Sequence, residues 1–108
     1  MISVGKDKTK IDLRYFRIGK DLLVIITGGD AHIGAVTLSE KGCYSTLSKK
    51  GHKECVITKQ VAPRIQNFFK KDVLVVCGIH IDNATLKEIS TLVENAKECV
   101  KIFLKEFK

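Results

Sequence analysis

A stripe of apolar residues spaced three and four positions apart fills the C-terminal part of the chain, and it constrains the fold more than any other feature. The spacing continues for about five turns, which predicts a long helix with one face packed on a core. Thr85 and Glu88 match a capping box, so we expect the helix to begin there. The far end of the stripe can pack on this core or on a second subunit. The stripe consists of Leu86, Ile89, Val93, Ala96, Val100, Phe103 and Phe107.

Ahead of this helix, four segments in the first half of the chain have the apolar patterns of strands. In the first segment, Ile11, Leu13 and Tyr15 share one face. A glycine-rich break that begins at Gly28 and Gly29 separates the second segment from the third, and it predicts a hairpin joining them. The four segments cover residues 8–18, 22–27, 33–39 and 43–47.

The pattern changes to a helical period after residue 54. Pro63 lies inside this second helix, where its missing N–H predicts a kink or a restart near residue 62. Residues 73–79 are then continuously apolar, which predicts a central strand covered on both faces. The helical positions are Cys55, Val56, Lys59, Ala62, Ile65, Phe68 and Phe69.

The resulting order is β-β-β-β-α-β-α. A chain of 108 residues is long enough for one hydrophobic core and too short for two. We therefore expect a single domain over residues 1–108, of the α+β class. Its antiparallel or mixed sheet carries the two helices packed on it.

The apolar runs are far shorter than the roughly 20 residues of a membrane span, and the polar first ten residues do not have the pattern of a secretory signal. No two cysteines form a C-x-x-C motif. We expect free, mostly buried thiols in a reducing compartment and hence a cytoplasmic protein, with a disulfide or a zinc site as the alternative. The cysteines are Cys43, Cys55, Cys77 and Cys99.

The formal net charge of +7 raises the alternative of a nucleic-acid-binding domain. The lysines are spread along the chain, with no run longer than two. Arginine, the preferred bidentate reader of phosphates and guanines, occurs only as Arg14, Arg17 and Arg64. A solvated basic surface is therefore favoured over a nucleic-acid interface.

All three histidines lie within two residues of a glycine, in three separate segments. The first segment holds Gly28, Gly29, Asp30, His32 and Gly34. Paired glycines allow positive φ and a close approach of a ligand to the main chain, and successive N–H groups can form an anion nest. A plain hairpin turn explains the pair equally well. It does not explain the glycine at 34, which weakens a strand unless something passes close to it.

The second segment, Gly51-His52-Lys53-Glu54, begins a predicted helix, where unpaired N–H groups and the helix dipole attract anions. The carboxylate of Glu54 can instead cap the helix or pair with Lys53. Exposed helix-start residues without a ligand are the alternative.

The third segment leads from the apolar strand into the last helix, a common position for ligands in α/β architectures. It contains Gly78, His80, Asp82 and Asn83. His80 and Asp82 alternate with apolar residues and should point to one side together, while Asn83 can cap the helix. A capped turn with a hydrogen-bonded histidine is the simpler alternative.

If the three segments meet, their residue types suit phosphate binding, a divalent metal or acid–base catalysis. A metal- or anion-binding protein, or an enzyme, that uses His32, His52 and His80 is therefore one alternative. Catalysis is the less favoured version, because the chain has no G-x-S-x-G, H-E-x-x-H or P-loop motif.

Residues 28–36, 51–54 and 78–84, in this order, resemble the prenylated-flavin chaperone LpdD-like proteins, a family named for a small accessory subunit of gallate decarboxylase. The resemblance spans residues 8–106. It implies a non-catalytic, chaperone-like protein that helps a UbiD-like decarboxylase obtain or keep prenylated FMN. It also implies a fold similar to the small proteasome-assembly chaperones, and with it a homodimer. The implied cofactor-binding residues are Gly28, Gly29, Asp30, His32, Gly34, Gly51, His52, Lys53, Glu54, Gly78, His80, Asp82 and Asn83.

Overall fold

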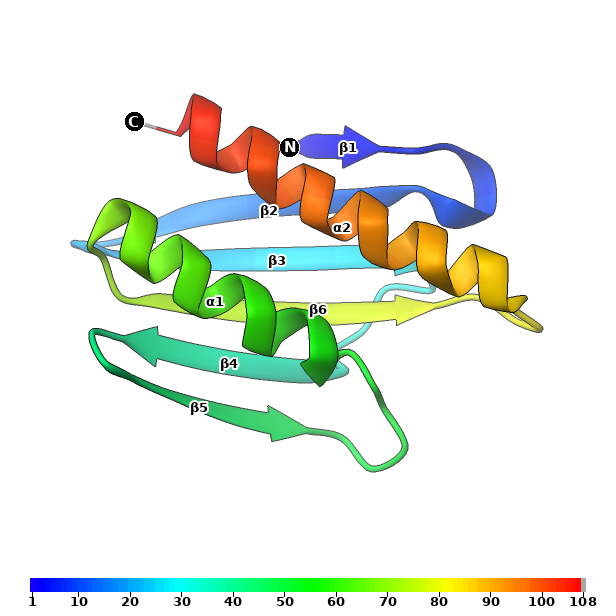
Figure 1. Cartoon of the computed structure of the whole chain (residues 1–108), viewed down its shortest axis with the longest axis horizontal. Helices are drawn as coiled ribbons and strands as arrows, with labels where there is room; N and C mark the ends of the chain where they lie inside the picture. The colour runs from blue at the N-terminus through cyan, green and yellow to red at the C-terminus, as the bar shows by residue number, and fades with distance from the viewer. Residues whose placement is uncertain (108) are drawn as a thin grey trace.

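The computed structural model of the protein describes residues 1–107. One mixed sheet of six strands has the order β1-β2-β3-β6-β4-β5, and both helices lie on the same face of it (Figure 1). The predicted α+β class is thereby confirmed, while the short edge strand β1 was not predicted. The elements are β1 (Ile2–Val4), the 3-10 helix η1 (Asp7–Thr9), β2 (Ile11–Ile18), β3 (Asp21–Gly29), β4 (Ala35–Glu40), β5 (Cys43–Ser48), α1 (Cys55–Phe69), β6 (Val73–His80) and α2 (Leu86–Glu106).

The core lies between the sheet and the helices. In β3, Val24 and Ile26 are fully buried under the helices, whereas the alternate residues Leu23 and Ile25 face the other side and are only partly covered. The same alternation buries Ile11 and Leu13 in β2, as the sequence predicted.

The predicted hairpin between residues 22–27 and 33–39 is wrong. Strand β6 lies between β3 and β4, parallel to β3 and antiparallel to β4. The glycine-rich segment has local turn chemistry, but residues 30–34 span the width of one inserted strand. Turn residues report local backbone conformation and carry no information about a strand that arrives later in the chain.

Helix α1 is continuous through Pro63, so the predicted restart near residue 62 does not occur. Its buried face is also shifted from the predicted one. Val56 and Phe68 are exposed by 53% and 58%. The residues that face the core are Ile57, Thr58, Val61, Ala62 and Ile65.

The predicted capping box begins α2: the Glu88 N–H donates to Thr85 Oγ1 over 3.1 Å, and the Thr85 N–H donates to Glu88 Oε1 over 2.9 Å. The stripe packs on the core only from Val93 onward, beside the buried Leu92, which was not predicted. Leu86 and Ile89, predicted as core, are exposed by 86% and 47%. Asn83, predicted as a possible cap, instead adopts a left-handed turn conformation with φ 54°.

The C-terminal end of the stripe packs within the chain. Phe103 and Phe107 are buried and form an aromatic cluster with Tyr15 and Phe69, with ring centroids 4.8–5.5 Å apart. These rings join the end of α2 to β2 and to the end of α1.

Strand β6 is central, but the helices cover only one of its faces, so the prediction of cover on both faces is corrected. Val73, Val75 and Cys77 are fully buried, whereas Leu74 and Val76 point away from the helices and are half-buried. We call the surface they belong to the helix-free face. Its apolar residues are Phe16, Ile18, Leu23, Ile25, Val36, Leu38, Leu47, Leu74 and Val76.

All four cysteines are free thiols, two of them buried. Burial raises the pKa of Cys77 to about 12 and that of Cys99 to about 11. Neither helix among residues 1–107 is long and apolar enough to cross a membrane.

Candidate functional site

The segment between β3 and β4 crosses the C-terminal end of β6, and this crossing organises the site. Where β3 ends, the Asp30 N–H donates to the carbonyl of His80 over 2.9 Å. Where β4 begins, the Gly34 N–H donates to the carbonyl of Cys77 over 2.9 Å. Residues 30–34 are therefore fixed to β6 at both ends.

Glycines make this close crossing possible. A Cβ atom on Gly78 would overlap the carbonyl oxygen of His32, so the crossing segment can lie against β6 only where β6 has no side chain. Gly29 has φ +63°, and a Cβ atom there would overlap the carbonyl oxygen of His80. A Cβ atom on Gly34 would overlap the Glu54 carboxylate. This contact explains why position 34 is glycine, which a simple hairpin turn would not require.

Glu54 is the buried centre of the site. It occupies the N-cap position of α1, but its side chain does not cap the helix. One carboxylate oxygen, Oε2, instead accepts the Ile79 N–H over 3.1 Å. The pairing of β4 with β6 ends at Ala35 and Cys77, so β4 has no residue opposite Ile79 that could accept this N–H. The carboxylate therefore accepts the hydrogen bond that a backbone carbonyl of a neighbouring strand would otherwise accept.

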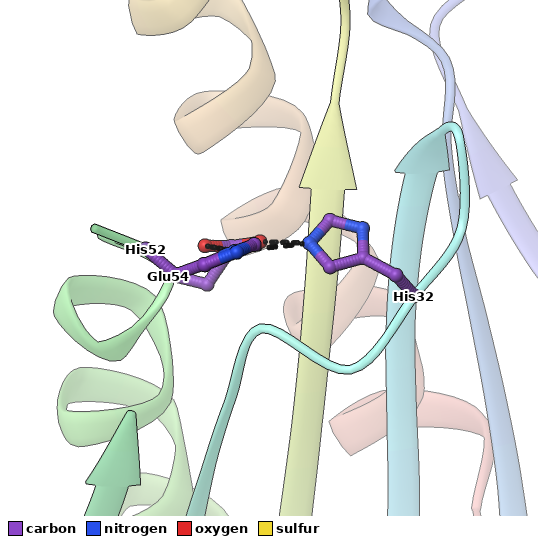
Figure 2. A group of neighbouring side chains, drawn as sticks. All are labelled: His32, His52 and Glu54. Atoms are coloured by element: carbon purple, nitrogen blue, oxygen red, sulfur yellow. Dashed lines mark hydrogen bonds and ion pairs between the residues drawn. The ribbon is translucent and has the colours of Figure 1, made fainter. Parts of the chain in front are cut away.

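Two histidines meet this carboxylate from different segments (Figure 2). His32 Nε2 lies 2.7 Å from Glu54 Oε2, and His52 Nδ1 lies 3.4 Å from Glu54 Oε1. The two ring nitrogens are 3.2 Å apart. Burial by itself would raise the pKa of Glu54, but the backbone N–H groups of Glu54 and Ile79, the charge of His32 and a hydrogen bond from His52 together lower it.

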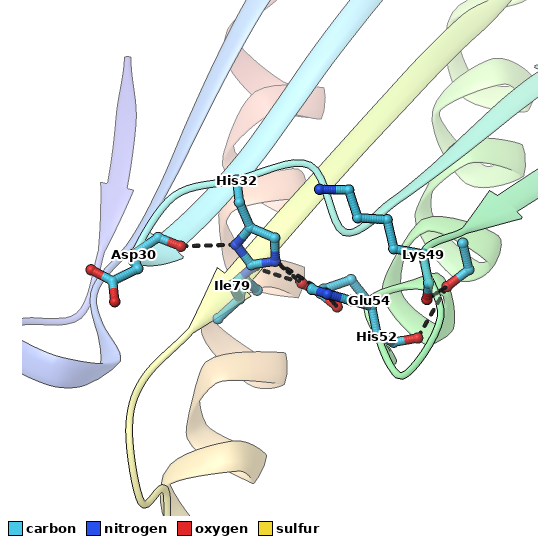
Figure 3. A network of polar contacts seen from close by, with 7 residues as sticks. Asp30, His32, Lys49, His52, Glu54 and Ile79 are labelled. Carbon is cyan, nitrogen blue, oxygen red and sulfur yellow. Dashed lines mark hydrogen bonds and ion pairs between the residues drawn. The ribbon is translucent and has the colours of Figure 1, made fainter.

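The tautomer of His32 follows from its other nitrogen (Figure 3). His32 Nδ1 lies 2.9 Å from the carbonyl oxygen of Asp30, which can only accept, so Nδ1 carries a proton. In a neutral ring Nε2 then has no proton, and its lone pair is directed at the Glu54 carboxylate. Two acceptors at this distance need a proton or a metal ion between them.

The loop that carries His52 is tightly held. The His52 N–H donates to the carbonyl of Lys49 over 3.0 Å, and Ser48 Oγ donates to the carbonyl of His52 over 3.0 Å. Gly51, with φ +79°, provides the turn between them. The backbone of His52 is thus fixed on both sides before any ligand arrives.

The third predicted segment does not join this cluster. His80 Nε2 is 3.0 Å from Asp82 Oδ1, and both side chains are exposed. Lys53 and Asn83 are exposed as well. The structure therefore brings together His32, His52 and Glu54 and leaves the His80–Asp82 pair on its own.

A hollow of about 490 Å³ lies between the start of α1, the end of β6 and the first turns of α2, and it does connect the second and third segments. Sequence reasoning missed its apolar wall, because it assigned Ile89 to the core and did not expect Val93 to line a hollow as well as pack against the core. The hollow is lined by Gly51, His52, Lys53, Glu54, Val56, Ile57, Ile79, His80, Ile81, Ala84, Ile89, Leu92 and Val93.

Two kinds of ligand chemistry are therefore available. His32 and His52 each offer one ring nitrogen, and Glu54 offers one carboxylate oxygen. These three atoms lie within 4.8 Å of one another and are a possible donor set for a metal ion. The hollow next to them combines an apolar wall with a polar rim, the usual build of a small-molecule site.

Residues 5–108 match the family described as the prenylated flavin chaperone LpdD-like domain. Over 80 residues the chain is 32% identical to Protein LpdD of Lactiplantibacillus plantarum. The match covers 68% of this chain and 59% of that protein, so the chain spans well under two thirds of the length of its relative.

A solved structure shares the fold. A chain in the crystal structure of a chaperone complex for yeast 20S proteasome assembly superposes with a TM-score of 0.64 at 10% sequence identity. The superposition covers 99% of this chain and 96% of the yeast-complex chain, which confirms the fold that the sequence resemblance implied. On the family match over nearly its whole length, the chain belongs to the prenylated flavin chaperone LpdD-like family.

Proposed function

We propose that this protein is a non-catalytic, chaperone-like accessory protein that holds prenylated FMN and passes it to a UbiD-like decarboxylase. The observation that carries the proposal is the hollow between α1, β6 and α2, with an aliphatic wall and a polar rim. Membership of the LpdD-like family supports the class of cofactor.

The two sides of the hollow suit the two parts of a prenylated flavin. Ile79 and Ile81 from β6 and its exit, with Ile89 and Val93 from α2, give an apolar surface for the ring system and the added prenyl carbons. On the rim, Lys53, His52 and His80 are cationic or hydrogen-bonding groups for the phosphate.

The absence of Phe, Tyr and Trp from the described lining is informative about the role. Aromatic stacking would add about 0.5–1.5 kcal/mol per ring pair to binding. An aliphatic wall holds a flavin more weakly, which suits a protein that must release its cofactor to an enzyme. The decarboxylation chemistry then belongs to the partner.

The test blocks the hollow without touching the core. Ile89→Arg places a long charged side chain at a half-exposed position of the apolar wall. Leu86→Arg is the matched control, because it makes the same change one turn earlier on α2, at an exposed position outside the lining. Absorbance titration with prenylated FMN and the activity of the reconstituted cognate decarboxylase are measured for both variants.

We expect Ile89→Arg to weaken prenylated-FMN binding at least tenfold and to abolish any activation of the decarboxylase, while Leu86→Arg behaves as wild type. If the wild-type protein neither binds the cofactor nor raises decarboxylase activity, the proposed function is wrong. If Ile89→Arg and wild type are equal in both assays, the hollow is not the cofactor site.

We also propose that the protein acts in the cytoplasm. Its four cysteines are free thiols, which fits a reducing compartment. The handover to a decarboxylase requires the two proteins to share that compartment.

The helix-free face supports a further part of the proposal, that two copies pair through their sheets. Phe16, Ile18, Leu38 and Leu47 are exposed by 50%, 58%, 53% and 75%, and half-buried aliphatic residues of β3 and β6 lie between them. Monomeric proteins rarely leave a continuous apolar surface of this kind in water. A two-fold arrangement buries the same face on both copies and leaves the hollow, on the helix side, accessible.

Light scattering coupled to gel filtration tests this pairing. We expect wild-type protein at twice the 12.0 kDa mass of one chain and Leu38→Lys at the monomer mass. Leu86→Lys, which adds the same charge at an exposed leucine of the helix side, should remain dimeric. A monomeric wild type, or a dimer that Leu38→Lys leaves intact, contradicts the proposed interface.

A further inference from the structure

We propose that His32, His52 and Glu54 form a binding site for one divalent transition-metal ion of the zinc class. The ligand atoms are His32 Nε2, His52 Nδ1 and a carboxylate oxygen of Glu54. The site is a property of these three side chains and does not rest on flavin binding.

The spacing of the ligand atoms fits an ion at their centre. Metal–nitrogen bonds of about 2.0–2.1 Å place the ligand atoms of a tetrahedral site about 3.3 Å from one another. Here the nitrogens of His32 and His52 are 3.2 Å apart, and His52 Nδ1 is 3.4 Å from Glu54 Oε1. His32 Nε2 lies 2.7 Å from the other oxygen of the same carboxylate, Oε2. One ligand atom from each of the three residues lies within 4.8 Å of the others, so a small rotation of the carboxylate, or ligation through both of its oxygens, completes the set.

The groups behind the ligands are already those of a metal site. A ligating histidine usually donates its second N–H to a carbonyl or carboxylate, which fixes the tautomer and aims the free nitrogen at the metal. His32 does this through Nδ1 and the carbonyl of Asp30. Glu54 is oriented by the N–H of Ile79, and the backbone of His52 is held by Ser48 and Lys49.

The donor set selects the class of ion. Two imidazoles and one carboxylate are typical of catalytic zinc and of non-haem iron, whereas Mg²⁺ and Ca²⁺ prefer oxygen ligands alone. Three protein ligands leave at least one coordination position for water or for a ligand. Since His52 and Glu54 also line the hollow, a molecule bound there lies next to the ion.

Without a metal, a second proton on His32 can hold the same contact with Glu54, so the experiment must separate the two occupants. Protein purified without a histidine tag is stripped with a chelator and titrated with Zn²⁺ against a chromophoric zinc chelator. His52→Gln removes one ligand at a half-exposed position and should leave the fold intact. His80→Gln, a histidine of the same hollow outside the cluster, is the matched control.

We expect one Zn²⁺ per wild-type chain, an affinity loss of about 100-fold in His52→Gln, and no change in His80→Gln. Saturating Zn²⁺ should also raise the Tm of wild type by about 10 °C, and that of His52→Gln by much less. Failure of the stripped wild type to bind Zn²⁺ stoichiometrically would overturn the proposal. Equal affinities of wild type and His52→Gln, or an equal loss in His80→Gln, would overturn it as well.

Discussion

Replacing Glu54 with alanine tests whether this carboxylate holds the site and the sheet together. In the metal-free protein, the side chain accepts the Ile79 N–H at the point where β4 has left β6, and it pairs with His32 at 2.7 Å. Alanine removes both interactions, together with the 3.4 Å contact to His52 Nδ1, and provides no acceptor in their place. We therefore expect Glu54→Ala to lower the stability strongly, although Glu54 lies at the start of a helix, where substitutions are usually tolerated.

The magnitude follows from the two losses. A buried backbone N–H without a partner costs about 1–3 kcal/mol, and removing one partner of a buried ion pair costs about 3–5 kcal/mol. His32 retains 23% side-chain exposure, so water can compensate it in part and the ion-pair loss falls below that range. Together these give about 3 kcal/mol, or a Tm lower by about 12 °C or more for a chain of this size. Glu54→Gln keeps an acceptor for Ile79 and should lose about 1–2 kcal/mol.

Urea denaturation in the presence of a metal chelator, followed by circular dichroism, gives the free energy of unfolding for each variant. Glu94→Ala is the control, because Glu94 is an exposed glutamate of α2 and its loss should change stability by no more than about 0.5 kcal/mol. A cost for Glu54→Ala as small as that of Glu94→Ala would refute the structural role assigned to the carboxylate.

Two further predictions concern the crossing of β6 and the buried thiols. Gly78→Ala should destabilise the protein by about 1–3 kcal/mol, because its Cβ atom would overlap the His32 carbonyl, and chemical denaturation should show a larger cost than for the control Glu94→Ala. In native protein, iodoacetamide should modify exposed Cys43 within minutes and leave Cys77 and Cys99 unmodified at neutral pH, since burial raises their pKa to about 12 and about 11; mass spectrometry of peptides checks this, and rapid labelling of Cys77 would contradict its burial.

Hydrophobic periodicity located most of the elements, because a period of 2 or 3.6 depends only on which face is buried. It failed where burial ends within an element. Leu86 and Ile89 continue the stripe of α2, yet the first turns of this helix extend past the core, where Leu86 is exposed and Ile89 lines the hollow. A stripe records which side of a helix is apolar and does not tell a core from the wall of a surface hollow.

The site was only partly predictable for a different reason. Glycine neighbours identified the three histidine segments, and His32 and His52 do meet. The role of Glu54 was missed, since its position next to a helix start favours a capping interaction. Only the strand order shows that an N–H of β6 lacks a partner there, and strand order depends on contacts distant in the sequence.

The placement of β6 connects these observations. Because β6 enters between β3 and β4, residues 30–34 must cross it, and the crossing needs glycine at position 78. The same crossing ends the β4–β6 pairing before Ile79, so the Ile79 N–H is left to donate to Glu54. This hydrogen bond fixes the start of α1 beside β6, where Glu54 and His52 lie next to His32. The donor cluster is therefore a consequence of the topology. A variant that disturbs the crossing, such as Gly78→Ala, should weaken Zn²⁺ binding although it changes none of the three proposed ligands.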